Sequence, residues 1–301
     1  MTNAIEIQSV TRAYGGSTAL DDVSLSVSEG SILGLLGRNG AGRTTLMSLI
    51  AGQDRPSAGR VAVYGQRPYE SESALSKVIF VRDNQRYPDN YDLHHVLRIA
   101  PVYAPSWDAD VAAEIVDGLR IPTRTRIKKF SRGQLSAVAI VLGLASRAPV
   151  TLLDEPYLGL DVTARGFFHD VLLRDYTAHP RTIVLSTHLI DESEALFDRV
   201  VILDRGRVRI DVPSEHVPDQ AFVLSGPSEA VDRLASARTV IDAHAVPGLK
   251  SATVAGAPDP ALRDEARRTG VQVSPVSLQE LVAAFGADAA EPGALTEGTR
   301  A

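Results

Sequence analysis

The sequence contains no cysteine, and this absence excludes several kinds of chemistry at once. Its 301 residues can form no disulfide bond, no thiolate metal site and no cysteine nucleophile. The chain is therefore indifferent to redox state, which is compatible with a reducing compartment.

Long apolar runs and an excess of basic residues are also missing. No stretch approaches the roughly 20 apolar residues of a spanning helix, and the first residues, Met-Thr-Asn-Ala-Ile-Glu-Ile-Gln, lack the pattern of a secretory signal. The net charge is -6, whereas nucleic-acid binding normally uses a concentrated basic face. We therefore expect a cytoplasmic protein that binds no nucleic acid, and another chain must supply any membrane on which it works.

The composition that remains is typical of a globular protein with two domains. Hydrophobic residues make up 44% and charged residues 23%, which argues against long disorder. Between 211 and 220 the composition becomes alanine-rich and prolines recur. We place a first domain at 1–212, an accessory domain at 213–286 and a loose tail at 287–301.

Apolar patterning predicts an α/β fold for the first domain. Alternating strands at 5–10 and 22–28 are followed by apolar strands and helices in alternation, which indicates a mostly parallel sheet with helices on its faces. From about 86 to 146 the pattern is helical, which we interpret as an insertion. Residues 220–274 follow the order βαββαβ, and a helix at 278–285 begins with the capping box of Ser277 and Glu280.

A glycine-rich segment predicts a phosphate-binding loop after the apolar strand at 31–36. Its glycines let successive N–H groups point at one centre, toward which the helix beginning near Arg43 also aims its dipole. The usual pattern ends in Gly-Lys-Ser/Thr, but arginine stands at position 43; its planar fork can bind phosphate, yet the exchange is not conservative. The loop comprises Gly37, Arg38, Asn39, Gly40, Ala41, Gly42, Arg43, Thr44 and Thr45.

Two further strand ends carry polar residues that can converge on this loop. Asp154 and Glu155 follow an apolar strand, and His188 follows the strand at 182–186. Ligands in parallel sheets bind beyond the carboxyl ends of strands. Asp154 can hold Mg²⁺ through water and Glu155 can polarise an attacking water, although a strand that simply ends in a solvated turn has the same pattern.

The segment 130–136 contains a second helix start that can bind an anion. Ser131 and Gln134 fit a capping box, and this structural role by itself accounts for their spacing. Together with the small Gly133 and a free hydroxyl, however, the helix start forms another anion site. Two such sites for one nucleotide need an explanation.

Seven elements together resemble a known family. Tyr14, the loop 37–45, the polar run ending in Gln85, Phe-Ser-Arg-Gly-Gln at 130–134, Leu-Leu-Asp-Glu-Pro at 152–156, Gly-Leu-Asp at 159–161 and Ser-Thr-His at 186–188 occur in the order found in nucleotide-binding subunits of ATP-binding cassette (ABC) transporters. The resemblance covers about residues 3–212. It implies a P-loop NTPase core with a small antiparallel β subdomain, and it is strongest for bacterial exporter-type ATPases with a short C-terminal extension.

The resemblance implies roles for individual residues at an ATP and Mg²⁺ site. Tyr14 would stack on adenine, the loop would cradle the phosphates, and Thr44 would coordinate Mg²⁺ with Asp154 behind it. Glu155 would be the general base and His188 would steady the γ-phosphate. Gln85 would contact Mg²⁺ or water and relay to the membrane partner; the run 81–85 could place Asp83 there instead, and we choose Gln85 by residue type.

The same resemblance implies that the second anion site serves the ATP of a partner subunit. Ser131, Gly133 and Gln134 would complete the ATP site of a second ATP-binding subunit, identical or different, with Asp161 crossing the same interface. ATP would then join a head-to-tail dimer that drives separate integral membrane permease subunits from the inner face of the cell membrane. Arg132 stands where the family usually has glycine.

These observations lead us to expect slow ATP hydrolysis coupled to export. A weakly active regulatory cassette of a heterodimer is an alternative, which Arg43 favours and the presence of both Glu155 and His188 disfavours. A non-transport cassette ATPase acting on ribosomes or DNA is the other alternative. The absence of heptads, of a second cassette and of basic charge argues against it.

Overall fold

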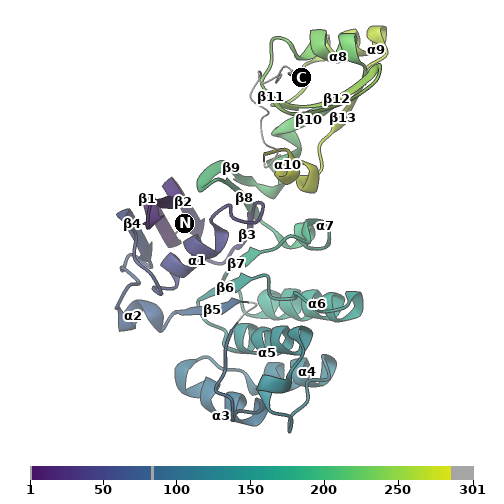
Figure 1. Cartoon of the computed structure of the whole chain (residues 1–301). Coiled ribbons are helices and arrows are strands. Elements are labelled where there is room, and N and C mark those ends of the chain that lie inside the picture. The colour runs from purple at the N-terminus through teal and green to yellow at the C-terminus, as the bar shows by residue number, and fades with distance from the viewer. Residues whose placement is uncertain (1, 83–84, 286–301) are drawn as a thin grey trace, which may run out of the picture. The chain divides into compact units, whose positions relative to one another are not determined.

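The structure is a computed structural model that describes residues 2–82 and 85–285. The chain separates into two compact units, Met1–Glu215 and His216–Ala301, coloured purple to green and green to yellow in Figure 1. The division falls three residues after the sequence-based boundary at 212. The tail predicted at 287–301 lies outside the described residues. In the described ranges, no helix combines the length and apolar character that crossing a membrane requires.

The first unit begins with a three-stranded antiparallel sheet. It contains β1 (Asn3–Tyr14), β2 (Ser17–Ser28) and β4 (Ala58–Val63) in the order β2-β1-β4. Every second residue of β2 from Val23 to Val27 is buried, as the alternating pattern predicts. This sheet confirms the small antiparallel β subdomain that the family resemblance implies.

The second sheet of this unit has six strands, of which five are parallel. Their order is β5 (Val78–Arg82), β6 (Val150–Asp154), β7 (Thr182–Ser186), β3 (Ile32–Leu36), β8 (Arg199–Asp204) and β9 (Arg207–Pro213). Strands β3, β6 and β7 are buried along their whole length, which explains why most of their residues are apolar. The antiparallel β9 closes the sheet at one edge.

Helices follow the strands as the α/β pattern predicts. They are α1 (Arg43–Ile50), α2 (Glu72–Leu75), α3 (Leu93–Tyr103), α4 (Ala109–Gly118), α5 (Arg132–Ala145), α6 (Val162–Ala178) and α7 (Ile190–Ser193). Helices α3, α4 and α5 occupy the residues predicted as a helical insertion, at the foot of Figure 1. Short 3₁₀ turns lie at Ile127–Lys129 and Glu194–Leu196.

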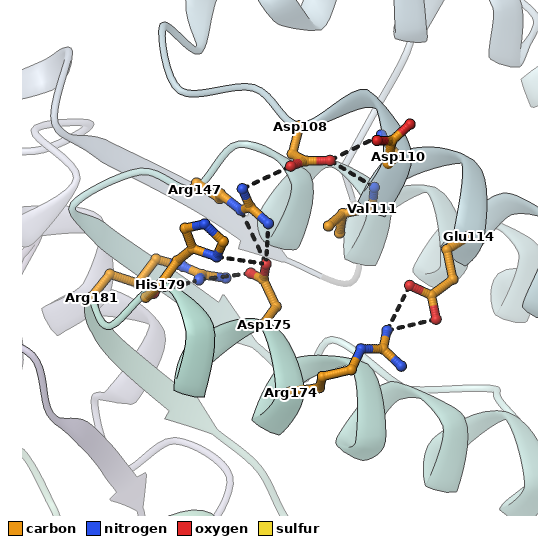
Figure 2. Close-up of polar contacts among 9 residues, drawn as sticks. All are labelled: Asp108, Asp110, Val111, Glu114, Arg147, Arg174, Asp175, His179 and Arg181. Carbon is orange, nitrogen blue, oxygen red and sulfur yellow. Dashed lines mark hydrogen bonds and ion pairs between the residues drawn. The ribbon is translucent and has the colours of Figure 1, made fainter.

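An ion-pair network centred on a buried carboxylate joins this insertion to the parallel sheet's helices (Figure 2). Asp175, on α6, is 3% exposed and lies 2.7 Å from Arg147 and 2.8 Å from Arg181. Arg147 also lies 2.7 Å from Asp108, which caps α4 by accepting from the N–H groups of Asp110 and Val111. One carboxylate thus fixes the start of β7 and, through Arg147, the first turn of α4.

The second unit has the predicted βαββαβ order. Its elements are β10 (Ala221–Pro227), α8 (Ser228–Ala235), β11 (Val240–Val246), β12 (Leu249–Ala255), α9 (Pro260–Thr269) and β13 (Gln272–Pro275), followed by α10 (Leu278–Phe285). All neighbouring strands pair antiparallel in the order β11-β12-β10-β13. Apolar residues of α8 and α9 pack on β10 and β12 to form a separate core. A 3₁₀ segment, Ser214–Asp219, precedes this sheet.

Candidate functional site

A pocket of about 520 Å³ lies over the carboxyl ends of the parallel strands. Strand order explains the convergence: β3 lies beside β7, and β7 lies beside β6, so the segments that follow these three strands share one edge. The pocket is lined by Tyr14, Ala19, Arg38, Asn39, Gly40, Ala41, Gly42, Arg43, Thr44, Thr45, Arg82, Asp154, Glu155 and Leu158.

The phosphate loop has the geometry that its glycines allow. Gly37 and Gly42 have φ values of 143° and 106°, which side chains with a Cβ rarely adopt. A Cβ on Gly37 would lie 2.3 Å from the carbonyl oxygen of Leu203, and one on Gly42 would lie 2.7 Å from that of Ala19. Gly42 is also the N-cap of α1 and provides no side-chain cap for the first N–H groups of the helix, whose first residues, Arg43 to Thr45, line the pocket.

Thr44 and Asp154 form the oxygen pair that a magnesium ion would need. Thr44 Oγ1 donates a hydrogen bond of 2.5 Å to Asp154 Oδ2, although the two residues are 110 positions apart. Asp154 is 7% exposed, at the end of β6. Hydroxyl and carboxylate oxygens are ligands that Mg²⁺ prefers, and it commonly takes few protein ligands and completes its shell with water and phosphate.

Arg43 is buried and binds the polar residues at the strand ends. Its Nη1 lies 3.2 Å from Glu155 Oε1, 3.1 Å from Ser186 Oγ and 3.2 Å from the carbonyl oxygen of Thr187. The Arg43 side chain is 8% exposed. The arginine therefore connects α1 to the ends of β6 and β7, and its guanidinium is held next to the carboxylate of Glu155.

Glu155 is held between two cationic or polar partners. While one carboxylate oxygen accepts from Arg43, the other lies 2.6 Å from His188 Nδ1 and accepts from the His188 N–H at 3.3 Å. The backbone of Glu155 has φ of 51°, an uncommon value for a residue other than glycine. Its own N–H donates to the carbonyl of Ser186. These contacts fix the carboxylate at the rim of the pocket.

Tyr14 lies at the other end of the pocket and is 45% exposed. Its hydroxyl donates a 2.5 Å hydrogen bond to Asp54, and the guanidinium of Arg12 covers its ring at 4.3 Å from the centroid. Arg12 also pairs with Asp54. The ring is thus held in place by Arg12 and Asp54 while it lines the pocket.

Gln85 lies apart from the phosphate pocket. It lines a second pocket of about 280 Å³ with Tyr87, Tyr103 and Trp107, and its buried Oε1 has no hydrogen-bond partner among the described residues. Among the described residues of this segment, Arg82 lines the phosphate pocket. Asp83, the alternative at this position, lies outside the described residues, so the contact of either side chain with Mg²⁺ stays a prediction.

The second helix start also lies outside the phosphate pocket of its own chain. Ser131 and Gln134 form the predicted capping box, with the Ser131 N–H 2.9 Å from Gln134 Oε1. Gly133 approaches Gly159 so closely that a Cβ would lie 2.5 Å from its carbonyl oxygen. Asp161 caps α6 by accepting from the N–H of Ala164. None of these residues lines the pocket described above, and their role at a partner's nucleotide stays a prediction.

Several site residues were assigned no role from the sequence. Ser186 binds Arg43, and Arg82 ends the strand that pairs with β6, directly opposite Asp154. Both lie at the carboxyl ends of parallel strands, so the rule that ligands bind there could have found them. Ala19 and Leu158 also line the pocket, but they are apolar and do not end a parallel strand, so this rule would not have found them.

The sequence is similar to known ATP-binding proteins. The family profile described as "ABC transporter" matches residues 20–158. The human "Glucosylceramide transporter ABCA12" is 33% identical over 223 residues, which cover 69% of this chain but 8% of that protein. The "Aliphatic sulfonates import ATP-binding protein SsuB 1" of Burkholderia cenocepacia is 31% identical, over 69% of this chain and 64% of the relative. The "Nod factor export ATP-binding protein I" of Rhizobium johnstonii is 32% identical, over 68% of this chain and 67% of the relative.

Solved structures have the same fold. A structure described as the ATP binding subunit of an ABC transporter has a TM-score of 0.64 and 25% identity, over 71% of this chain and 91% of that one. A dimeric ATP-binding cassette in a post-hydrolysis state, bound to ADP and Pi, has a TM-score of 0.59 and 22% identity, over 70% of this chain and 98% of that one. These likenesses confirm the α/β fold predicted for the first unit.

Proposed function

The chain belongs to the ABC transporter family as an ATP-binding subunit, and on that premise we propose that it hydrolyses Mg²⁺-ATP slowly to drive export through separate membrane subunits. The observation that carries the proposal is the Thr44–Asp154 pair beside Glu155 at the phosphate loop. The pair supplies oxygen ligands for the metal, and the neighbouring carboxylate can accept a proton from water.

Each side chain of the pocket has a proposed part in this reaction. The loop N–H groups and Arg43 bind the phosphates, and Tyr14 stacks on the adenine. Glu155 acts as general base on the attacking water and His188 steadies the γ-phosphate. A bound Mg²⁺ would neutralise the charge that develops on the phosphate oxygens.

Partner chains complete the proposed cycle. Ser131 lies at the N-terminus of α5, where the helix dipole favours an anion, and it is exposed. We propose that this end covers the ATP of a second ATP-binding subunit, with Asp161 at the same interface. ATP binding closes the pair, hydrolysis opens it, and the permease follows from the inner face of the membrane. We propose export because a short accessory unit follows the cassette, as in the exporter-type ATPases that the chain resembles.

The dimer is tested with a variant that retains ATP. Glu155→Gln is expected to become dimeric on addition of Mg²⁺-ATP, because the nucleotide then joins the two subunits and is not removed. Light scattering after size exclusion measures the mass with and without ATP. The matched control is the double variant Glu155→Gln with Ser131→Arg, whose bulky side chain blocks the second half of the site and should keep the protein monomeric. A Glu155→Gln species that stays monomeric at high concentration contradicts the composite site.

Arg43 distinguishes a slow enzyme from a regulatory cassette. Its Nη1 contacts Glu155, Ser186 and Thr187, and these contacts compete with a phosphate for the guanidinium and with water for the carboxylate. Arg43→Lys is expected to raise ATP turnover roughly fivefold, the factor that about 1 kcal/mol of barrier represents. A steady-state phosphate-release assay measures this change.

The matched control for this substitution is Arg233→Lys on α8 of the second unit. Arg233 is exposed and does not line the phosphate pocket, so its exchange for lysine should change turnover by less than about twofold, within the small effects of most surface substitutions. If Arg43→Lys lowers turnover instead, arginine is the better phosphate ligand here and does not restrain Glu155.

A further inference from the structure

The sheet of the second unit has two edges that differ in their protection. Strand β13 is only four residues long and ends in Pro275, which has no N–H to offer. Strand β11 has seven residues, Val-Ile-Asp-Ala-His-Ala-Val, and contains neither proline nor lysine. Edge strands are usually shortened or blocked by such residues because a free edge can pair with another strand. Among the described residues, β11 is therefore the edge that no shortening or proline blocks, and α10 also packs near this strand.

The exposed side chains of β11 and its hairpin are partly apolar. Val246 is 63% exposed and Leu249, directly opposite on β12, is 55% exposed. Ala243 and Ala245 are also exposed. A register shift between Val240 and Asp242 marks a bulge at one end, which leaves 242–246 regularly paired with β12. Within the described part of the chain, residues 242–246 thus offer a regularly paired edge, and three of these residues, Ala243, Ala245 and Val246, have small or apolar side chains.

The sequence of β11 is complementary to itself. Asp242 and His244 lie on one face of the strand, and His244 Nε2 is 3.0 Å from Asp242 Oδ2. If a second copy pairs antiparallel with its two-fold axis at Ala243, each Asp242 lies opposite His244 of the other copy, and Ala243 lies opposite Ala243. An axis one residue earlier sets two carboxylates against each other, and an axis one residue later sets two imidazoles against each other.

We propose that β11 is a self-association edge, at which two copies of this chain join their accessory sheets through antiparallel β11 strands centred on Ala243. The contact needs no nucleotide and uses no residue of the phosphate pocket. Two carboxylate–imidazole pairs flank the axis, and the small side chain of Ala243 lets the two backbones approach there. The interface is independent of the ATP-dependent contact proposed for the cassettes.

A single cysteine tests this arrangement, because the natural chain has none. Residues directly opposite in an antiparallel pair have Cβ atoms about 4.5–5.5 Å apart, close to the separation that a disulfide spans. Full-length Ala243→Cys, without ATP or Mg²⁺, is therefore expected to form a disulfide-linked dimer under mild oxidation. The matched control, Ala261→Cys on α9, is also exposed and should cross-link on the order of tenfold more slowly, because its thiols are not held at the high effective concentration of a paired strand.

Charge exchange in the same background tests the register. Adding His244→Asp sets carboxylate against carboxylate and should slow cross-linking to the rate of the control, while Asp242→His with His244→Asp should restore it. If Ala243→Cys remains monomeric, or cross-links no faster than Ala261→Cys, the self-association edge is wrong. If the double exchange fails to restore cross-linking in a variant of unchanged circular dichroism, the register at Ala243 is wrong. Neither result bears on the ATPase, since no nucleotide is present.

Discussion

Replacing Glu155 by glutamine is expected to lower ATP turnover by about 10²- to 10⁴-fold, the range that a positioned general base contributes. Glutamine keeps the shape of the side chain and its acceptor oxygen, but its amide cannot take a proton from water. Glu155 lines the phosphate pocket and is already held by Arg43 and His188. The substitution thus changes the chemistry of the group more than its position.

Nucleotide binding should survive this substitution. The phosphate loop, Thr44 and Asp154 supply the contacts to phosphate and metal, and none of them is changed. Phosphate release measures turnover, and fluorescence of a labelled ATP analogue measures affinity in the same variant. The combination of lost turnover and retained affinity separates a catalytic role from a general collapse of the site.

The matched control is Glu192→Gln, on the short helix after His188. Glu192 pairs with Arg165 at 2.7 Å and does not line the phosphate pocket. Its exchange should leave turnover within about twofold of wild type, because exposed ion pairs contribute little to stability. If wild type hydrolyses ATP no faster than Glu155→Gln, the chain is not an active enzyme and the regulatory alternative gains support.

The strands and the phosphate site could be predicted because their signals are local. Strand β7 has the predicted bounds, 182–186, since a buried parallel strand has an apolar centre, here Ile183 to Leu185. The loop at 37–45 and the acids at 154–155 lie at strand ends, and parallel topology brings such ends together. For these parts, the order of the motifs along the chain was enough to predict which residues meet at the site.

Other features depended on contacts that the sequence does not encode locally. Strand β9 is the exception, because Arg-Val-Arg-Ile-Asp at 207–211 alternates as a half-buried edge strand should and yet was not predicted. The partners of Arg43 are 112 to 144 residues away, so its position beside Glu155 required the fold. Gln85 was chosen by residue type, but packing of the helical insertion places its side chain in a different pocket.

Replacing Asp175 by alanine is expected to lower the free energy of unfolding by about 3–5 kcal/mol, the cost of leaving a buried charge without its partner. Figure 2 shows Asp175 between Arg147 and Arg181. Arg147 retains Asp108, but the Arg181 side chain is 4% exposed and its Nε and Nη2 have no hydrogen-bond partner among the described residues. Burial already lowers the pKa of Arg181, an effect that Asp175 opposes.

An exposed ion pair in the same region provides the control. Glu114 on α4 binds Arg174 on α6 at 2.6 Å, also drawn in Figure 2, and these side chains are 40% and 60% exposed. Glu114→Ala should therefore cost no more than about 1 kcal/mol, although it too removes a link between the insertion and α6. Urea unfolding followed by circular dichroism measures both variants under the same conditions.

A double variant shows whether the unpaired arginine causes the loss. Arg181→Met removes the buried charge and keeps much of the side-chain volume, so Asp175→Ala with Arg181→Met should be more stable than Asp175→Ala alone. Part of the loss should remain, because Arg147 and His179 also face Asp175. If the losses of unfolding free energy caused by the two single substitutions simply add, the carboxylate acts by packing and not by compensating the charge of Arg181. Recovery would identify Asp175 as the charge that lets the buried start of β7, and with it the strand leading to His188, fold against α6.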